Sequence, residues 1–162
     1  MSIADIISKS NITIGMFGGK FVPFHKGHLH CLERAAEECD LVHLILFSNR
    51  RFFDGISGVW GFRERMDAVE RAAAMFDNVI PHGIDTSCCK GWDDETPLVR
   101  AIAPRIDRVY SSEPSYGEYF ARAYPEAEHV LVDPERKEVP ISGTMIRDMM
   151  RKEESEWKKW II

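Results

Sequence analysis

Short apolar runs alternate with amphipathic stretches along this chain. The runs 12–17 and 41–47 are almost continuously apolar, which is typical of strands buried on both faces. Between them, apolar residues recur every three or four positions, which predicts a helix over 28–39. The residues that set this spacing are Leu29, Leu32, Ala36 and Cys39.

The same alternation continues toward the C-terminus. After a loop over 48–60, a second amphipathic helix is marked by Phe62, Met66, Val69 and Ala73. Further strands are predicted at 79–80, 108–111 and 129–132, and further helices at 96–103, 116–123 and 142–151. Alternating strands and helices imply crossover connections. The predicted fold class is therefore α/β, a Rossmann-like, doubly wound, mostly parallel sheet with helices on both faces.

No repeat or linker interrupts this pattern, so we expect one domain over 1–162, with a short helical extension over about 153–162. The formal net charge of −5 argues against a nucleic-acid partner, which favours a basic surface. No apolar run approaches the roughly 18 residues of a membrane span, and the first residues do not resemble a secretory signal. The four cysteines form no CxxC pair. We expect a cytoplasmic protein with reduced thiols and no membrane partner.

In open α/β sheets, ligands bind beyond the carboxyl ends of the strands. At the first such junction Gly18 and Gly19 let backbone approach a ligand, and Lys20 supplies a cation. His25 lies three residues before His28, which opens the helix, where exposed N–H groups favour anions. These features predict a phosphate site. The alternatives are a simple tight turn or a zinc site, but the histidine spacing matches no common tetrahedral pattern, so we expect no metal ligands here.

A second junction precedes the helix over 142–151. Ser142 is a good N-cap, Thr144 lies in the first turn, and Arg147 can return to the same place with a planar fork of donors. The segment therefore predicts either a second phosphate contact or simply a capped helix with a surface arginine.

Both junctions resemble signatures of one superfamily. The segment 25–28, His-Lys-Gly-His, resembles the HxGH signature of the nucleotidyltransferases, and 141–147 matches their ISxTxxR signature at every fixed position. The resemblance implies a Rossmann-like fold and direct nucleotidyl transfer with release of pyrophosphate, assisted by Mg²⁺. In this mechanism His28 contacts the α-phosphate, while His25 and Lys20 steady the leaving pyrophosphate.

Four stretches, 19–21, 91–93, 111–113 and 130–136, are similar to the adenylyltransferase domain of NadR-type nicotinamide-nucleotide adenylyltransferases. The likeness covers about 12–160, although that family often has threonine at the position of His25. It implies that ATP and nicotinamide mononucleotide are the substrates and that NAD is the product. The DNA-binding segment and the kinase domain of the longer family members are not carried over.

The resemblance also assigns roles within the pocket. Trp92 is expected to stack on the pyridinium ring, and Asp93 to accept from the carboxamide or the ribose. Arg65 is expected to contact phosphate, and Ser112 and Glu113 to lie near the adenosine. The alternatives are a tryptophan packed against the core and a solvated arginine.

Two rival functions stay open at this point. One is another enzyme of the same superfamily, either a pantetheine-phosphate adenylyltransferase or a cytidylyltransferase. The other is a non-catalytic nucleotide sensor. The apolar C-terminal end, 157–162, leaves open whether it docks on its own domain or forms a homo-oligomer.

Overall fold

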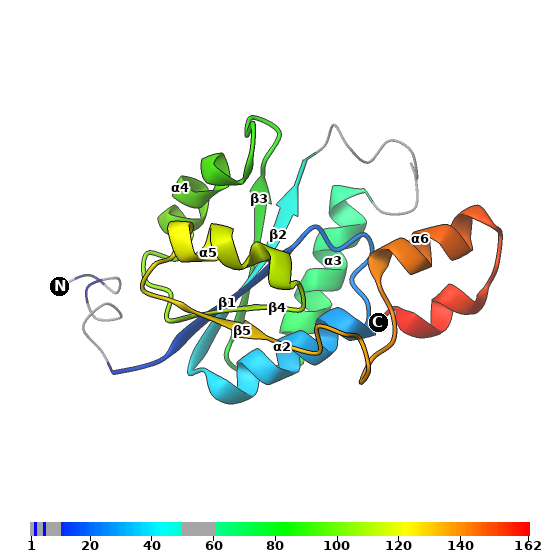
Figure 1. Ribbon diagram of the computed structural model, residues 1–162, viewed down its shortest axis with the longest axis horizontal. Helices are drawn as coiled ribbons and strands as arrows, with labels where there is room; N and C mark the ends of the chain where they lie inside the picture. The colour runs from blue at the N-terminus through cyan, green and yellow to red at the C-terminus, as the bar shows by residue number, and fades with distance from the viewer. Residues whose placement is uncertain (1, 3–4, 6–10, 50–60) are drawn as a thin grey trace.

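The computed structural model describes residues 2, 5, 11–49 and 61–162, so most of the loop predicted over 48–60 lies outside the described residues. Five strands form one sheet: β1 (Ile14–Gly19), β2 (Leu41–Ser48), β3 (Val79–Asp85), β4 (Arg108–Ser111) and β5 (Glu128–Leu131). The helices are α2 (Lys26–Glu38), α3 (Phe62–Ala73), α4 (Trp92–Ile102), α5 (Gly117–Ala123) and α6 (Gly143–Arg151), with short 3₁₀ turns η2 (Pro114–Tyr116) and η3 (Glu156–Trp160) (Figure 1).

The strand order is β3-β2-β1-β4-β5, and all four strand pairs are parallel. The chain winds outward in one direction from β1 to β3 and then crosses back to β4. The order therefore reverses between β1 and β4, which is the switch point where such sheets bind ligands. This arrangement confirms the predicted Rossmann-like α/β fold class.

Residues along the strands alternate between two cores. Phe17 of β1 and Leu44 of β2 pack with α2 and α3, whereas Met16 and Ile45 pack with α4 and α5. All four side chains are buried. Since both faces of the sheet are covered, its central strands read as continuous apolar runs, and this is why the sequence pattern located them.

Two elements differ from the prediction. Strand β3 continues to Asp85 instead of ending at residue 80, because β2 offers it a parallel partner at each of its seven positions. Its proline and glycine weaken the local strand pattern without preventing this pairing. Helix α4 begins at Trp92 instead of residue 96, with three acidic residues in a first turn where negative charge is favourable. Trp92 and Asp93 therefore belong to a helix N-terminus.

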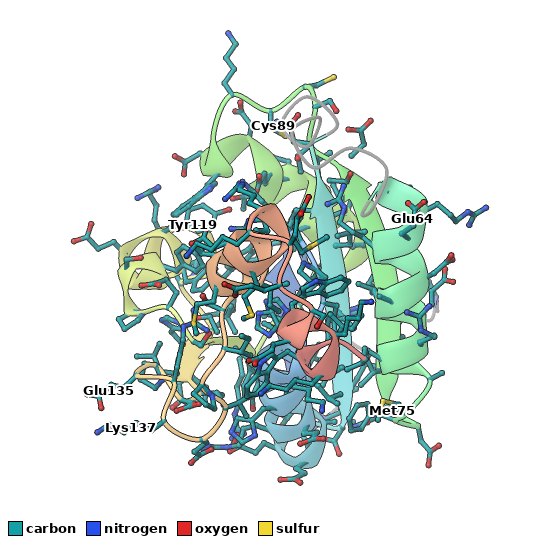
Figure 2. The ribbon with its side chains drawn as sticks, turned by 90° about the vertical axis from the view of Figure 1, so that its right-hand side faces the viewer. Glu64, Met75, Cys89, Tyr119, Glu135 and Lys137 are labelled. Atoms are coloured by element: carbon teal, nitrogen blue, oxygen red, sulfur yellow. The ribbon has the colours of Figure 1, made fainter. Side chains whose placement is uncertain are left out.

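The C-terminal end docks on its own domain. Ile161 pairs in antiparallel fashion with His25, and Ile162 packs against the core beside α2. Figure 1 shows the chain end returning to α2 after η3. Seen from the side, Glu64 and Met75 project outward near α3, and Glu135 and Lys137 project from the loop before α6 (Figure 2). Within the described part of the chain, no helix combines the length and the apolar character needed to span a membrane.

Candidate nucleotide-binding site

A cavity of about 600 Å³ opens at the carboxyl edge of the sheet, at the switch point. Its wall is formed by the ends of β1 and β4, the start of α4 and the start of α6. All but three of the residues singled out from the sequence line it: Gly18, Gly19, Lys20, His28, Trp92, Ser112, Glu113, Ser142, Thr144 and Arg147. The structure therefore brings the two signature segments to one cavity. The exceptions are His25, Arg65 and Asp93.

The two signature histidines form the N-terminus of α2. His25 is the N-cap, and its Nδ1 accepts hydrogen bonds from the backbone N–H groups of Gly27 at 3.0 Å and His28 at 3.4 Å. In return, His28 Nδ1 accepts from the backbone N–H of His25 at 3.2 Å. The two rings stack with their centroids 3.6 Å apart. Because both Nδ1 atoms act as acceptors, each neutral ring carries its proton on Nε2.

Both rings are neutral at physiological pH. Burial, together with the charges of Arg136 and Arg147, lowers the pKa of His25 to about 4. Burial, the neighbouring His25 and Arg136 lower the pKa of His28 well below its usual range. His28 lines the cavity and can present its Nε2–H as a neutral donor, whereas His25 is 2% exposed and lies outside the cavity wall. The predicted contact of His25 with pyrophosphate is thus replaced by a capping role.

The second signature opens α6 and is tied to the first. Ser142 is the N-cap, and its Oγ accepts from the backbone N–H of Met145 at 3.1 Å. Arg147 donates to Thr144 Oγ1 at 3.2 Å and to the backbone oxygen of Val22 at 2.8 Å. A single guanidinium therefore links α6 to the loop between β1 and α2. Arg147 acts both as a pocket cation and as a brace.

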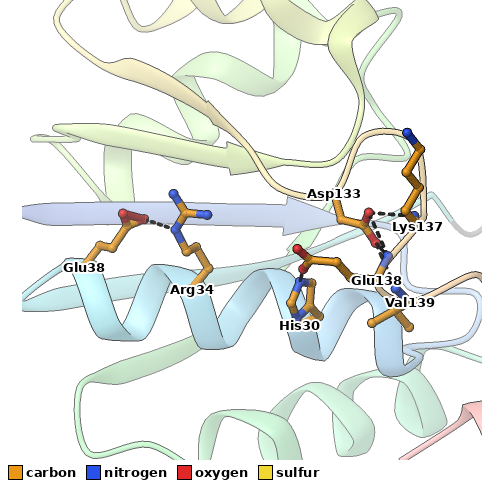
Figure 3. Close-up of polar contacts among 7 residues, drawn as sticks. All are labelled: His30, Arg34, Glu38, Asp133, Lys137, Glu138 and Val139. Atoms are coloured by element: carbon orange, nitrogen blue, oxygen red, sulfur yellow. Dashed lines mark hydrogen bonds and ion pairs between the residues drawn. The ribbon is translucent and has the colours of Figure 1, made fainter.

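A compact loop delivers a further cation. The carboxylate of Asp133 accepts from the backbone N–H groups of Lys137, Glu138 and Val139, which lowers the pKa of that carboxyl (Figure 3). Glu138 also pairs with His30 on α2, which joins this loop to the helix that carries His28. Between these anchors Arg136 lines the cavity and donates to the backbone oxygen of Ile141 at 3.0 Å.

Lys20 lies where the sequence predicts it, whereas Arg65 does not line the cavity. Lys20 is exposed and lines the cavity. Arg65 is 2% exposed and donates to the backbone oxygen of Lys20 and to Ser48 Oγ, both at 3.0 Å. Its guanidinium is therefore occupied in holding the Lys20 turn against β2. The structure gives Arg65 a positioning role in place of the predicted phosphate contact.

Aromatic side chains form another part of the cavity wall. Trp92 is 47% exposed and contacts Tyr116 and Tyr119 edge to face, with ring centroids 5.0 and 5.4 Å away. All three rings line the cavity. Tyr119 donates to the backbone oxygen of Trp92 at 2.8 Å, which fixes α5 against the start of α4. An exposed indole face in such a wall suits a flat cationic ring.

The remaining predicted residues fall on both sides of the cavity boundary. Ser112 and Glu113 line it just after β4, and Glu113 accepts from the backbone N–H of Ser115 at 3.2 Å. Asp93 is exposed and forms a bidentate pair with Arg122 on α5. Its carboxylate faces that arginine and does not line the cavity, so the predicted contact with a carboxamide or ribose has no support in this geometry.

Several cavity residues were not predicted from the sequence: Phe47, Glu95, Tyr116, Tyr119, Arg136 and Arg151. Glu95 follows Trp92 by three residues, which places both on one side of a helix. A helix start at Trp92 would have exposed that relation, but the sequence analysis began the helix four residues later. Arg136 ends the family-like stretch 130–136 and Arg151 ends the predicted helix over 142–151, but the sequence analysis gave neither side chain a role.

The structure also bears on the zinc alternative. Across residues 11–49 and 61–162, no three histidine, cysteine or acidic side chains gather as a metal site would require. The four cysteines are unpaired thiols. Burial raises the pKa of Cys31 to about 12, so this thiol stays protonated within the signature helix α2.

These features define a class: an α/β protein with a nucleotide-sized cavity at its switch point, whose wall carries both cationic and aromatic side chains. The chain belongs to the cytidylyltransferase-like family, whose model matches residues 16–149. This match confirms the resemblance carried by the two signatures and, at the level of enzyme class, the prediction of a nucleotidyltransferase.

Individual relatives point to different acceptors. The chain is 29% identical over 156 residues to the trifunctional NAD biosynthesis/regulator protein NadR of Escherichia coli (strain K12), covering 84% of this chain and 36% of that protein. It is 28% identical over 155 residues to a nicotinamide-nucleotide adenylyltransferase of Thermococcus sibiricus, covering 91% and 77%. It is 27% identical over 139 residues to a phosphopantetheine adenylyltransferase of Campylobacter curvus, covering 84% and 85%.

The chain spans little more than a third of the length of the NadR relatives it matches. Among solved structures, a NadR protein in complex with NAD and AMP-PNP is similar with a TM-score of 0.70 at 19% identity, covering 93% of this chain and 45% of that chain. At this identity the likeness supports the fold alone.

Proposed function

We propose that this protein is an adenylyltransferase that makes NAD and pyrophosphate from ATP and nicotinamide mononucleotide. The observation that carries the proposal is that one cavity is lined by both cationic and aromatic side chains. His28, Lys20 and Arg147 line the part that we call the phosphate end, and Trp92 and Glu95 line the part that we call the ring end. A dinucleotide needs both environments at once, because its phosphates are anionic and its pyridine ring is flat and cationic.

The reaction requires positioning more than proton transfer. The phosphate of the mononucleotide is already anionic at neutral pH, so it can attack the α-phosphorus of ATP in line without a general base. The new bond joins the two phosphates, and the bond to the β-phosphate breaks as pyrophosphate leaves with both electrons of that bond. Catalysis then depends on donors aimed at the charge that develops on the transferring group.

His28 is the central donor in this proposal. Its Nδ1 is held by the backbone N–H of His25, so the Nε2–H is fixed in orientation before substrate binds. A neutral imidazole donates this hydrogen bond from Nε2 and does not take a proton from the incoming phosphate. The hydrogen bond strengthens as the α-phosphate gains charge. His25 supports this geometry from behind, as the cap of α2.

Several cations are available for the β- and γ-phosphates. Lys20 approaches from the β1 end, Arg136 from the loop before α6, and Arg147 and Arg151 from α6. The hydroxyl of Thr144 and the N-terminus of α6 add donors. Ser112 and Glu113 flank the region that we assign to the adenosine.

Mg²⁺ fits this site as a companion of ATP. The described residues form no carboxylate cage, and Glu95 and Glu113 are the acidic side chains among those that line the cavity. Mg²⁺ commonly keeps several waters and binds through substrate phosphates. Bound to the triphosphate, it would neutralise charge on the leaving pyrophosphate, while the orientation of the phosphates falls to the protein side chains.

A pantetheine-phosphate acceptor is the second candidate, since a phosphopantetheine adenylyltransferase is among the relatives. The aromatic wall favours the mononucleotide, because pantetheine offers no planar cationic ring to Trp92. The direct test presents ATP or CTP with each acceptor and follows pyrophosphate and the coupled product. Turnover of ATP with nicotinamide mononucleotide supports the proposal. Turnover only with phosphopantetheine or only with CTP overturns it, and binding of NAD without any turnover points to a nucleotide sensor.

A further inference from the structure

The first turn of α4 carries three acidic side chains, and they have different surroundings. Asp93 is paired with Arg122, and the carboxylate of Asp94 accepts from the backbone N–H of Lys90 at 2.8 Å. Neither lines the cavity. Glu95 lines it, one helical turn from Trp92, and makes no hydrogen bond or ion pair within the described residues.

Within the described residues, no hydrogen-bond donor contacts the carboxylate of Glu95. It is partly buried, and this burial raises the pKa of Glu95, while the charge of Lys20 opposes the rise. The neighbouring aromatic rings of Trp92 and Tyr119 provide no cation. A carboxylate in such a place is stabilised by any ligand that brings N–H groups or positive charge.

We propose that Glu95 makes this pocket select an amide mononucleotide over the corresponding acid, an inference that rests on the proposed function. A carboxamide on the pyridinium ring offers two N–H donors to the carboxylate, and the cationic ring adds attraction. A carboxylate on the same ring offers no donor and places two negative charges together. The discrimination is therefore both a hydrogen bond gained with the amide and a repulsion imposed on the acid.

This inference moves the specificity role from Asp93, where the sequence resemblance placed it, to Glu95. The reason is geometric. The carboxylate of Asp93 is held by Arg122 outside the cavity wall, and Glu95 is the acidic residue that lies on the same side of α4 as the stacking ring. The two assignments make opposite predictions for matched variants.

The experiment compares wild type, Glu95→Gln, Asp93→Asn and Glu118→Gln with ATP and each mononucleotide. The ratio of kcat/KM for the amide to that for the acid is the readout, with Kd for each mononucleotide from calorimetry. Glutamine keeps the volume of Glu95 but removes the charge and supplies an N–H that the acid can use. We expect the ratio to fall about tenfold or more in Glu95→Gln. Glu118 is exposed on α5 outside the cavity wall, and Glu118→Gln is expected to match the wild type.

The outcomes separate this inference from the function on which it rests. If wild type turns over a mononucleotide and Glu95→Gln leaves the ratio unchanged, or lowers both substrates equally, the inference is overturned and the function stands. A change in ratio for Asp93→Asn instead of Glu95→Gln also overturns it. Wild type that neither binds nor converts either mononucleotide overturns both. Glu95→Ala, which suits a helix, is the second variant, and it is expected to lower the ratio in the same direction.

Discussion

The two ends of the cavity are built in different ways. At the phosphate end, hydrogen bonds between backbone and side chain hold the groups that line it. His25 and His28 cap each other, and Arg147 is fixed to Val22. At the ring end, Trp92 is nearly half exposed, and Glu95 lines the cavity without a hydrogen bond among the described residues, although the charge of Lys20 acts on it. Under the proposed function, the first end is pre-organised for charge that develops during the reaction, and the second completes its contacts when the ligand binds.

This difference suggests a division of labour. A pre-organised donor contributes most in the transition state, so changes at the phosphate end should lower kcat. An open ring site contributes to ground-state binding and to choice of substrate, so changes there should alter KM and selectivity. The variants below test this division.

The largest effect is expected for His28→Ala. Loss of one pre-organised donor to a developing oxyanion costs about 10²–10³ in kcat, with a much smaller change in KM for ATP. Steady-state kinetics at a saturating concentration of mononucleotide measures both kcat and the KM for ATP. His82→Ala removes a histidine that lies outside the cavity wall, and it should retain wild-type kcat. Near-normal kcat in His28→Ala would contradict the central role of this imidazole.

Acid should weaken the phosphate end through its histidines. The folded pKa of His25 is about 4, below the usual 6.5, so the unfolded chain binds more protons between these values. Stability is therefore full above about pH 7 and falls as the pH drops toward 4, by ~2 kcal/mol at pH 5 from this residue. Thermal unfolding from pH 8 to 5 measures it. His25→Asn keeps an N-cap without a titrating ring, so its slope should be shallower. Equal slopes would show that His25 is not held neutral.

Trp92→Ala tests how much the ring end contributes to binding of the mononucleotide. Loss of a cation–π contact and its buried area should raise KM for the mononucleotide by about tenfold. KM for ATP serves as the internal control and should stay close to wild type, since we assign the adenosine to the region of Ser112 and Glu113. An unchanged KM for the mononucleotide would remove the stacking role. A fall confined to kcat would argue against the division between the two ends.

The smallest effect is expected for His25→Ala, and it tests a supporting residue. Loss of an N-cap costs ~1 kcal/mol of stability, and a loosened His28 should lower kcat less than His28→Ala does. His25→Asn restores an acceptor for the N–H groups of Gly27 and His28, so both properties should recover in large part. If the asparagine variant is as slow as the alanine variant, the histidine ring itself touches substrate and the capping account is insufficient.

The sequence predicted the fold and the phosphate end well because both depend on local rules. Buried parallel strands appear in the sequence as apolar runs. The two signatures lie at helix starts, where the first backbone N–H groups have no partner within the helix, independently of tertiary contacts. The polar side chains of the Ser142–Arg147 turn were predicted from the sequence in the same way.

The ring end was predicted less well because it depends on tertiary contacts. The pairing of Asp93 with Arg122 joins α4 to α5, and the burial of Arg65 joins α3 to the Lys20 turn. Neither partner can be read from local sequence. Glu95 was missed because the predicted helix began at residue 96, whereas the acidic first turn and the packing of Tyr119 on Trp92 place that start at Trp92.

The central claim is that a single cavity binds both halves of the dinucleotide. Its most direct test is a crystal structure of this protein with the dinucleotide product bound. The account predicts the pyridine ring against Trp92, its carboxamide toward Glu95, and the bridging phosphates within hydrogen-bond distance of His28 Nε2. A dinucleotide bound away from the switch point, or lying with its pyridine ring among Lys20 and Arg147, would contradict it.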